Sequence, residues 1–424
     1  MRKFNFKRAL HLIVVGLLGV VFFGCSKDET ISESSRANQQ FYQILKSYYL
    51  WNDKVPTLNL SNYSDPYKLL EAVRYQAVDR YSFVMSKQEY LDYFQNSVYI
   101  GFGFSLAFDA QRNLRIAYIF NDSPLASMGV TRGWRITHIN GSVPTSDNLA
   151  SLLGPSTAGV SAIFKMVDLD GVEHEGTFAK RTVAFNSILA KRVVDVGGKK
   201  VGYLAFQSFV SNSEAELNSA FQYFNQQGVE ELVVDLRYNG GGLTSVATLL
   251  ASQIIGSGNS SKVFFTYVHN SMQRKLDTTI KFSNNSYAIN GLTKVAFIGT
   301  KGTASSSELV INGLKPYMDV KLVGAQTYGK PVGMYVFTYE NYAFFPICFS
   351  TQNSLGVGDY YNGLAVDVAA NDDLARDFGD PLEDSFAKAL QSIGITTGVR
   401  SSAIAPAASY VVPSSDIGKL TGVY

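Results

Sequence analysis

Cysteine, histidine and tryptophan are scarce in this sequence, and its charges nearly cancel. The 424 residues include two cysteines, four histidines and two tryptophans, and the formal net charge is +2. With so small a net charge, and no dense run of lysine and arginine after the basic N-terminus, the chain lacks the electrostatic footprint of a nucleic-acid-binding protein. No histidines, cysteines and carboxylates stand at metal-ligand spacing. We therefore expect no nucleic-acid partner, no metal and no cofactor.

The apolar run at the N-terminus is short for a membrane-spanning helix. Residues 9–23 are apolar, basic residues precede them, and Gly24 and Cys25 follow. This order of basic, apolar and small residues is typical of a secretory signal. Cys25 also resembles the lipidated cysteine of bacterial lipoproteins. We therefore expect a lipoprotein signal peptide over 1–24 and a lipid anchor on Cys25, with an ordinary cleaved signal as the alternative.

The residues after Cys25 also indicate where the lipoprotein is located in the cell. The segment Ser26–Glu29 resembles the acidic export tag of some Gram-negative lipoproteins. We therefore expect a bacterial outer-membrane lipoprotein that is periplasmic or surface-exposed. In the mature chain Cys348 then has no partner cysteine, and the apolar stretch around it indicates a buried side chain rather than a disulfide.

The pattern changes from tether to helix near residue 39. Residues 25–38 are polar and lack periodicity, which predicts a tether between membrane and protein. Over 39–97 apolar residues recur at helical spacing, for example at Phe41, Leu45 and Tyr48. We predict a small helical N-terminal domain.

Short strands and two motifs mark residues 98–182. The stretch YIGFGFSLAF is followed, after another strand pattern, by SPLASMGVTRGWRITHING. Together they resemble a PDZ domain of the kind found in bacterial proteases, with Trp134 in place of the usual Asp. The resemblance implies that a loop of backbone N–H groups holds a peptide's C-terminal carboxylate while the peptide adds an extra strand. This loop comprises Gly101, Phe102, Gly103 and Phe104. A glycine-rich hairpin alone is the alternative.

Strands alternate with helices from 183 to 395. The stretches KKVGYLAFQSF, ELVVDL, KVAFIG and VKLVGA are expected to be strands, with helical patterns among them. This succession predicts an α/β core with parallel strands. Sites in such sheets form where loops leave the carboxyl ends of strands. We therefore expect the glycine loop after Asp235 and the serines after Thr300 to lie on the same rim.

The residues on this rim suit acyl transfer. Three serines, Ser305–Ser307, stand at the start of a predicted helix, where free N–H groups and the helix dipole favour a serine alkoxide. The glycines Gly240–Gly242 lack the flanking residues of a phosphate-binding loop, and their N–H groups suit a developing oxyanion. None of the histidines that remain after signal removal, His138, His174 and His269, has the context of a triad base.

A lysine is the other candidate for the base. Lys330 stands in TYGKPVG among mostly apolar neighbours, with no adjacent acid. In an apolar pocket the charged form of lysine is disfavoured, so a neutral amine can accept the serine proton. On spacing alone, a strand, a helix cap and a turn explain these residues equally well.

The order of three motifs favours catalysis. The stretches DLRYNGGGL, GTASSSELV and GAQTYGKPVG, behind a PDZ-like domain, resemble the C-terminal processing (tail-specific) peptidase family of Ser/Lys-dyad serine proteases. The resemblance covers roughly residues 40–395. It implies a multidomain α+β fold with an N-terminal helical domain, a PDZ domain and an α/β catalytic core of the tail-specific, crotonase-like type. It also implies Ser305 as nucleophile, Lys330 as general base, and the N–H groups of Gly241 and Ser306 as oxyanion-hole candidates.

The chain departs from the family pattern around this dyad. Met334 stands where many members have a Gln that orients the lysine, and Pro316 stands where some have Asp. Gln326 is a candidate substitute for the absent Gln. Glu308 matches the acid of the serine motif, and we expect it to have a structural role at the helix start.

Two functions remain open. The first is a serine-type endopeptidase that binds the apolar C-terminal tail of a protein or peptide on its PDZ domain and cuts upstream with the dyad. The second, favoured by Met334, is a non-catalytic surface lipoprotein that binds peptides or other ligands. Residues 396–424 are rich in Ser, Ala and Pro and are expected to form a flexible tail. Occupancy of the chain's own tail-binding groove by the apolar end is the less favoured alternative.

Overall fold

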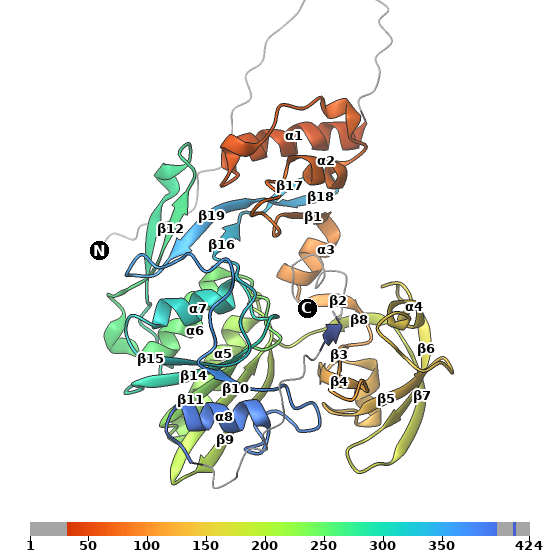
Figure 1. Ribbon diagram of the computed structural model, residues 1–424, viewed down its shortest axis with the longest axis vertical. Coiled ribbons are helices and arrows are strands. Elements are labelled where there is room, and N and C mark those ends of the chain that lie inside the picture. The colour runs from red at the N-terminus through yellow and green to blue at the C-terminus, as the bar shows by residue number, and fades with distance from the viewer. Residues whose placement is uncertain (1–31, 397–409, 413–424) are drawn as a thin grey trace, which may run out of the picture.

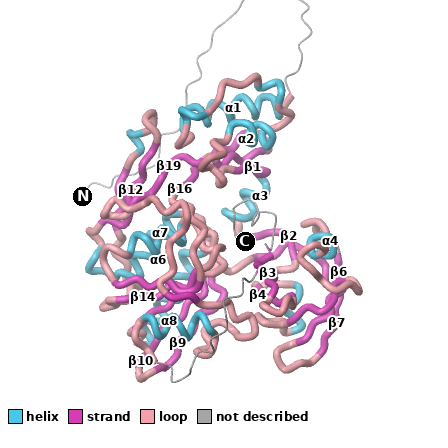
Figure 2. Tube along the Cα trace, in the orientation of Figure 1, coloured by secondary structure: helices cyan, strands magenta, loops and turns pink. Residues whose placement is uncertain are grey.

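The computed structural model describes residues 32–396 and 410–412, which form three parts (Figure 1). Figure 1 shows a helical segment at one end, an α/β body that reaches the opposite end, and a β-sheet body at the side. Figure 2 shows the side body as mostly strand and loop, whereas helices gather in the other two parts. The predicted combination of N-terminal helices with a mixed α/β core is confirmed. The signal peptide and Cys25 lie outside the described residues.

A six-stranded sheet forms the centre of the α/β body. Its strands, in spatial order, are β20 (Val368–Ala369), β15 (Asp319–Gly324), β14 (Lys294–Gly299), β11 (Glu231–Asp235), β10 (Lys199–Phe206) and β9 (Ile188–Val196). The five from β20 to β10 run parallel, as predicted, and β9 pairs antiparallel with β10. The inner strands read as continuous apolar runs because both faces of the sheet are covered.

Four helices cover the two faces of this sheet. They are α5 (Ser213–Gln227), α6 (Thr244–Ile255), α7 (Ser306–Leu314) and α8 (Asp384–Ser392). Apolar side chains of α5, α6 and α7 share one buried cluster with strand residues such as Leu204 and Phe297. Those of α8, such as Phe386, share a second cluster with Tyr203 and Val233 on the opposite face. The sheet is therefore fixed from both sides, and the loops at its carboxyl edge have a rigid base.

Two smaller sheets join the α/β body to the helical segment. The first has the order β13 (Thr278–Lys281), β12 (Val263–His269), β19 (Ile347–Gln352) and β16 (Val332–Met334). The second has the order β1 (Phe83–Ser86), β18 (Tyr342–Phe345) and β17 (Phe337–Tyr339). Because β1 belongs to the N-terminal segment and pairs with β18, residues far apart in the chain, such as Phe83 and Phe345, lie side by side.

The N-terminal helices are α1 (Glu33–Tyr48), α2 (Pro66–Val73) and α3 (Lys87–Tyr90). The tether predicted over 25–38 is wrong in its last residues, because Ser32 caps α1 and the helix starts at Glu33. The ring of Phe41 stacks on that of Phe344, with 4.5 Å between centroids. The helices thus bury their apolar faces against strands of the α/β body.

The side body contains most of the segment 98–182. Its main sheet has the strands β3 (Phe104–Phe108), β4 (Leu114–Ile119), β5 (Arg135–Ile139), β6 (Ser161–Val167) and β7 (Glu173–Ala179), with helix α4 (Leu149–Leu153). Strands β2 (Val98–Gly101) and β8 (Arg181–Ala184) pair where the chain enters and leaves it. A cluster of buried apolar residues, centred on Phe104, Ile116 and Phe164, gives this sheet a core of its own.

A sixth strand completes the side sheet. Strand β21 (Tyr410–Val412) pairs antiparallel with β3, so β3 is covered by a segment from the end of the chain (Figure 1). We expected residues 396–424 to form a flexible tail, and for 410–412 that expectation is wrong. The physical reason is that an edge strand offers a row of backbone N–H and C=O groups to any extended segment within reach. Composition does not reveal such an edge.

Buried charges hold the side body against the α/β body. Arg132 bonds to the Asp372 carboxylate at 2.5 Å and to the Tyr238 hydroxyl at 2.8 Å. Arg237 bonds to the same Asp372 oxygen at 2.7 Å and to Glu383 at 2.8 Å. Although burial alone would raise it, the two guanidinium groups lower the pKa of Asp372 to about 2. The charges of this network therefore compensate one another inside the protein.

Replacing Asp372 with Ala should destabilise the protein strongly. The change leaves Arg132 and Arg237 buried with fewer anionic partners, which costs on the order of 3–5 kcal/mol. The matched control is Asp377→Ala, since the Arg192–Asp377 pair is exposed and exposed pairs contribute about 1 kcal/mol or less. Urea unfolding of the two variants measures the difference, and similar free energies of unfolding would contradict the assignment.

Candidate active site

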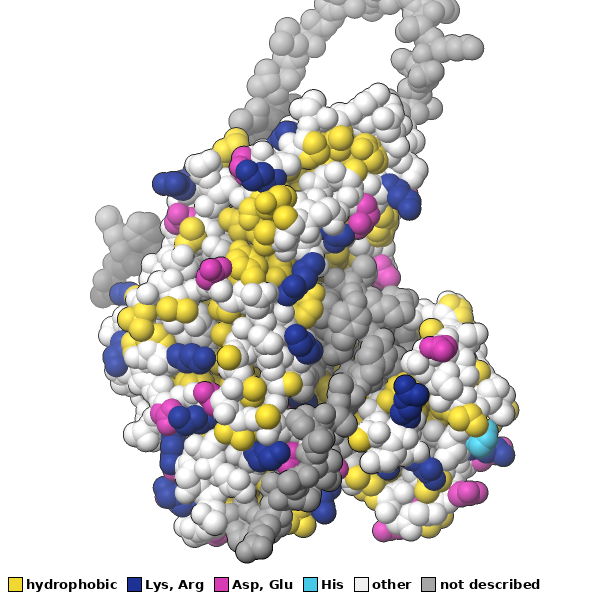
Figure 3. All heavy atoms as spheres, in the orientation of Figure 1, with side chains coloured by type: hydrophobic (Ala, Val, Ile, Leu, Met, Phe, Trp, Pro, Cys, Tyr) yellow, Lys and Arg dark blue, Asp and Glu magenta, His cyan; other side chains and the backbone are white. Residues whose placement is uncertain are grey.

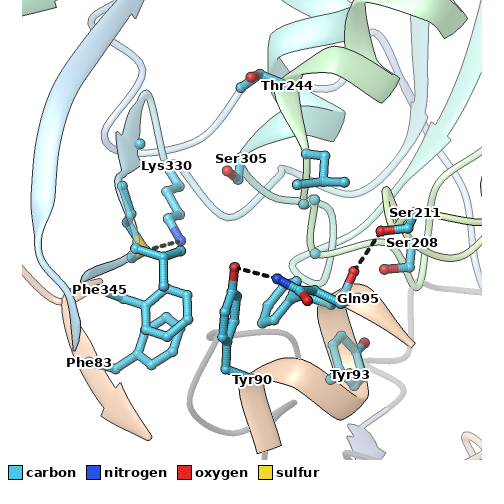
Figure 4. A pocket seen from close by; sticks show the side chains of 18 of the residues that line it. Phe83, Tyr90, Tyr93, Gln95, Ser208, Ser211, Thr244, Ser305, Lys330 and Phe345 are labelled. Carbon is cyan, nitrogen blue, oxygen red and sulfur yellow. Dashed lines mark hydrogen bonds between the residues drawn. The ribbon is translucent and has the colours of Figure 1, made fainter. Parts of the chain in front are cut away.

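A cavity of about 670 Å³ contains Ser305 and Lys330 in its wall. Figure 4 shows the two side chains reaching the cavity from different elements, with aromatic rings opposite them. The aromatic lining residues are Phe83, Tyr90, Tyr93, Phe94, Tyr118, Tyr238, Tyr267, Tyr335, Phe345 and Phe349. The structure therefore brings together the serine and the lysine singled out in the sequence, in a largely apolar setting.

Ser305 has an unusual backbone conformation. It lies at the N-cap of α7, after β14 and a tight loop, with φ 54° and ψ −115°. A residue with a Cβ in this region costs on the order of 1–3 kcal/mol, so the surrounding contacts must hold it there. The N–H of Ser305 donates to Glu308 Oε2 at 3.0 Å, and its carbonyl oxygen accepts from Leu309. These bonds fix the serine at the cavity despite the strain.

Lys330 is buried between β15 and β16. Burial lowers the pKa of its amine to about 8, and the nearby charges of Asp79 and Glu308 partly oppose this shift. The closest acceptor of its Nζ is the sulfur of Met334, at 4.0 Å. No hydrogen bond joins the Lys330 amine to the Ser305 hydroxyl in the structure. At pH 7 a pKa of about 8 leaves roughly a tenth of this amine uncharged, far more than for an exposed lysine, and the uncharged form is the one that a general base requires.

The Glu308 carboxylate ties the two residues together. Its Oε2 accepts the backbone N–H groups of Ser305 at 3.0 Å and Lys330 at 2.8 Å. Its Oε1 accepts the N–H of Gly329 at 2.7 Å and the hydroxyl of Thr327 at 2.5 Å. Burial raises the pKa of Glu308, and these donors work against the rise. One buried side chain thus fixes both the start of α7 and the lysine loop.

The glycine loop approaches the serine closely. A Cβ on Gly241 would lie 2.8 Å from Ser305 Cβ and from the nitrogen of Ser306, so only glycine fits here. However, the N–H of Gly241 donates to Asn239 Oδ1 at 2.9 Å. This differs from the expectation that Gly241 offers a free donor to an oxyanion. Among the residues that the structure describes, none accepts a hydrogen bond from the N–H of Ser306.

Three residues of the N-terminal segment, missed in the sequence analysis, surround the lysine loop. The Tyr81 hydroxyl donates to the carbonyl of Gly329 at 2.5 Å. Arg80 donates to the carbonyl of Tyr328 at 2.9 Å. The charge of Asp79 acts on Lys330. Their only sequence signal was their position at the end of the helical segment, and that signal does not indicate a contact with residues some 250 positions later.

Gln326 does not replace the absent Gln. Its side chain is exposed, and it has no contact with the amine of Lys330 among the interactions of the structure. Met334 itself lines the cavity beside Lys330. The lysine therefore faces a thioether at the position where the resemblance led us to expect an amide.

His269 is buried, and it is connected to the cavity through Tyr335. Its Nδ1 pairs with Asp277 at 2.8 Å and its Nε2 with the Tyr335 hydroxyl at 2.9 Å. Tyr335 lines the cavity, whereas His269 does not contact Ser305. Within residues 32–396, no group of three His, Cys, Asp or Glu side chains is arranged to hold a metal ion.

The loop Gly101–Phe104 lies in the side body. The rings of Phe102 and Phe104 are buried in the core of that body and stack at 5.8 Å between centroids. Their backbone, rather than their side chains, is what this loop could present to a ligand. The next residue, Ser105 on β3, lines the same cavity as Ser305. The side sheet and the candidate active site are therefore contiguous.

The charged side chains on the surface do not indicate a binding site. On the face in Figure 3, basic and acidic side chains are interspersed rather than gathered into a patch of one sign. No helix in the part of the chain that the structure describes is long and apolar enough to cross a membrane.

Family models match two parts of the chain. Residues 200–358 match the model described as peptidase family S41, and residues 36–83 match the peptidase S41 N-terminal domain. The first match contains Ser305 and Lys330. The second contains Asp79, Arg80 and Tyr81. The fold around the cavity is thus built from both matched regions.

Several curated proteins are similar to this chain. A CtpA-like serine protease of Staphylococcus epidermidis is 33% identical over 132 residues, covering 31% of this chain and 26% of that protein. A similarly described protein of Staphylococcus saprophyticus is 21% identical over 347 residues, covering 78% and 67%. The carboxyl-terminal-processing protease of Synechocystis is 23% identical over 292 residues, covering 67% and 66%. The chain thus matches about a quarter of the length of the first relative.

One solved structure shares the fold over most of its length. An S41 protease structure from Bacteroides fragilis superposes with a TM-score of 0.73 and 23% identity, covering 84% of this chain and 96% of that one.

Replacing Ser305 with Gly should stabilise the protein relative to Ser305→Ala. Both changes remove the hydroxyl, but only glycine also removes the Cβ that is strained at this φ. After the entropic cost of glycine, we expect the Gly variant to be more stable by about 1 kcal/mol. Urea unfolding measures this difference. An Ala variant as stable as the Gly variant would show that the position is not strained.

Replacing Lys330 with Met should stabilise the protein at pH 7. The folded amine has a pKa of about 8, below that of an unfolded lysine, so holding its proton in the folded state costs up to about 3 kcal/mol. Above pH 8 the folded amine is neutral while the unfolded one keeps its proton, so the wild type gains stability as pH rises and the gap closes.

Urea unfolding from pH 6.5 to 10 measures this gap. The control is the exposed Lys301→Met, which should leave the free energy of unfolding unchanged. A gap that does not shrink with rising pH would mean that Lys330 is not held at a lowered pKa.

Proposed function

The chain belongs to peptidase family S41, and from this premise we propose that it is a serine peptidase in which Ser305 attacks the substrate and Lys330 is the general base. The observation that carries the proposal is that both side chains line one apolar cavity and that burial lowers the pKa of the lysine to about 8. A neutral amine beside a serine hydroxyl is the minimal machinery for acyl transfer.

The proposed reaction has two halves. In the first, Ser305 Oγ bonds to the carbonyl carbon of the scissile peptide while its proton passes to Lys330 Nζ. The tetrahedral adduct then collapses, the C–N bond breaks, and the leaving amine takes the proton from Lys330. In the second half, a water molecule attacks the carbonyl carbon of the acyl ester and gives a proton to Lys330 Nζ. Lys330 then passes this proton to Ser305 Oγ as the ester C–O bond breaks, and the carboxylic acid product is released. Each half returns the lysine to its neutral form.

Two groups have to move for this reaction. The Lys330 amine has to leave Met334 and reach the Ser305 hydroxyl, and hydrogen bonds of this kind often tighten only when substrate is bound. The N–H of Ser306 is free to stabilise the oxyanion, whereas that of Gly241 must first leave Asn239. The aromatic lining suits an apolar substrate side chain next to the bond that is cut.

We further propose that the side body is a PDZ domain and that it presents substrate to the cavity. Its loop Gly101–Phe104 would hold the C-terminal carboxylate of a protein or peptide with an apolar end, and β3 would pair with the tail. The position of Ser105 in the cavity wall supports this route, because a chain extended along β3 is brought to the site. The Ser26–Glu29 segment and Cys25 support placement of the protein as a lipoprotein of the outer membrane.

A second function is favoured by one observation. Met334 leaves Lys330 without an amide partner, and the lysine has no hydrogen bond to Ser305. These features fit a non-catalytic lipoprotein that uses the same fold to bind peptides. The two functions differ in whether a bound polypeptide is cut.

Cleavage of an unfolded protein with an apolar C-terminus distinguishes them. Residues 26–424 should cut it, and Ser305→Ala and Lys330→Ala should each lower kcat/KM at least about a thousandfold. For the wild type, kcat/KM should rise with pH and level off above about 8, where the lysine is neutral. The control Lys315→Ala, at the exposed end of α7, should cut normally. Binding without cleavage by all of these proteins would favour the second function.

A further inference from the structure

The free edge of the side sheet is occupied by the chain itself. Strand β21 pairs with β3 in the register Tyr410 opposite Phe108, Val411 opposite Ala107 and Val412 opposite Leu106. In the spatial order of the sheet, β21 stands at one end, next to β3, and β7 stands at the other. Figure 1 shows β21 beside β3, far in sequence from every other strand of that body.

The direction of β21 leads toward the cavity. Because the pairing is antiparallel, successive residues of β21 run from Phe108 toward the start of β3. Beyond the last paired residue, Leu106, the next position on β3 is Ser105, which lines the cavity with Ser305. The strand thus follows the route that the proposed function gives to a substrate tail.

Two strands cannot use this edge at once. Each backbone N–H and C=O on the outer side of β3 has one place for a ladder partner, so a segment paired there excludes another extended chain. We propose that residues 410–412 are an intramolecular occupant of the β3 edge that competes with substrate tails. The self-pairing stands on the strand register, whereas the competition with substrate rests on the proposed function.

The position of residues 410–412 in the chain also distinguishes their binding to β3 from that of a substrate tail. Val412 is not at the end of the chain, since twelve residues follow it up to Tyr424. The segment therefore pairs as an internal strand, and its hold on β3 does not need a carboxylate in the loop Gly101–Phe104. A free C-terminal tail gains that additional contact. It can consequently displace the occupant, whereas a tail without a carboxylate is at a disadvantage.

Because residues 410–412 are part of the same chain as β3, even a strand of this length can compete for the β3 edge. Three paired residues provide little affinity by themselves, but a tethered segment faces its site at an effective concentration in the millimolar range. A competing peptide must overcome that concentration. Disrupting β21 should therefore raise the apparent affinity of the same edge for a peptide added in solution by about tenfold or more.

Peptide binding to the full chain tests this inference. The probe is a fluorescein-labelled peptide of residues 404–418, made with a C-terminal amide and with a free acid, and binding is measured by fluorescence anisotropy. The test protein carries Val411→Pro together with Val412→Pro, because proline at both positions removes whichever N–H donates to β3. We expect this protein to bind the peptide at least about tenfold more tightly than the wild type. Amide and acid should bind alike, because the peptide pairs through residues 410–412 and its end, six residues beyond Val412, is not held in the loop Gly101–Phe104.

The matched control carries Val411→Thr together with Val412→Thr, which keeps the backbone donors and the β-branched shape. It should bind the probe as weakly as the wild type. Equal binding by the wild type and the proline variant, or no binding by either, would overturn the inference. Near-UV circular dichroism shows whether the proline variant keeps its tertiary packing.

Binding and cleavage together separate this inference from the proposed function. If the proline variant binds the peptide tenfold more tightly than the wild type and no variant cleaves, residues 410–412 occupy the β3 edge but the protein is not a peptidase. If cleavage depends on Ser305 and the two proteins bind the peptide equally, the protein is a peptidase but residues 410–412 do not compete for the β3 edge. If both hold, the proline variant should show a lower KM for a protein substrate with an unchanged kcat.

Discussion

The buried carboxylate of Glu308 is the contact on which the rest of the site depends. It accepts the N–H groups of Ser305 and Lys330, which belong to different loops of the sheet, and it is fully enclosed. A charge in such a place is tolerated because four donors surround it. In return, it holds a strained serine and a desolvated lysine at one cavity. Neither residue's local sequence would keep it there.

The lysine is supported by residues from three parts of the chain. The N-terminal segment supplies Asp79 and the Tyr81 hydroxyl, which binds the carbonyl next to Lys330. The α/β body supplies Glu308, and β16 supplies Met334 in place of an amide. The base is thus tuned mainly by burial rather than by a hydrogen-bonding partner. This arrangement explains how the helical segment, which brings no predicted catalytic residue, belongs to the site.

Local patterns predicted the elements, but not how distant ones meet. The parallel strands and the helix after the three serines followed from periodicity. The pairing of Ser305 with Lys330 was implied by the resemblance of three motifs to a known family. The role of Glu308 at the start of α7 was expected from the sequence, but its bond to the Lys330 N–H and the role of Asp79 were not, because they depend on burial and on pairing across the chain. Likewise, the Asn239 bond that engages Gly241 and the pairing of residues 410–412 with β3 are properties of edges and loops. Neither the periodicity nor the composition of a single sequence reveals such contacts.

The most direct test of the account is the pH dependence of Ser305 labelling by a fluorophosphonate, followed by intact mass and peptide mapping. If a neutral Lys330 activates Ser305, the labelling rate should rise with pH and level off above about 8, and Lys330→Met should react at least about a hundredfold more slowly. Labelling of Ser305 at the same rate in Lys330→Met, or no labelling of a folded wild type at any pH, would contradict the assignment of a Ser/Lys dyad.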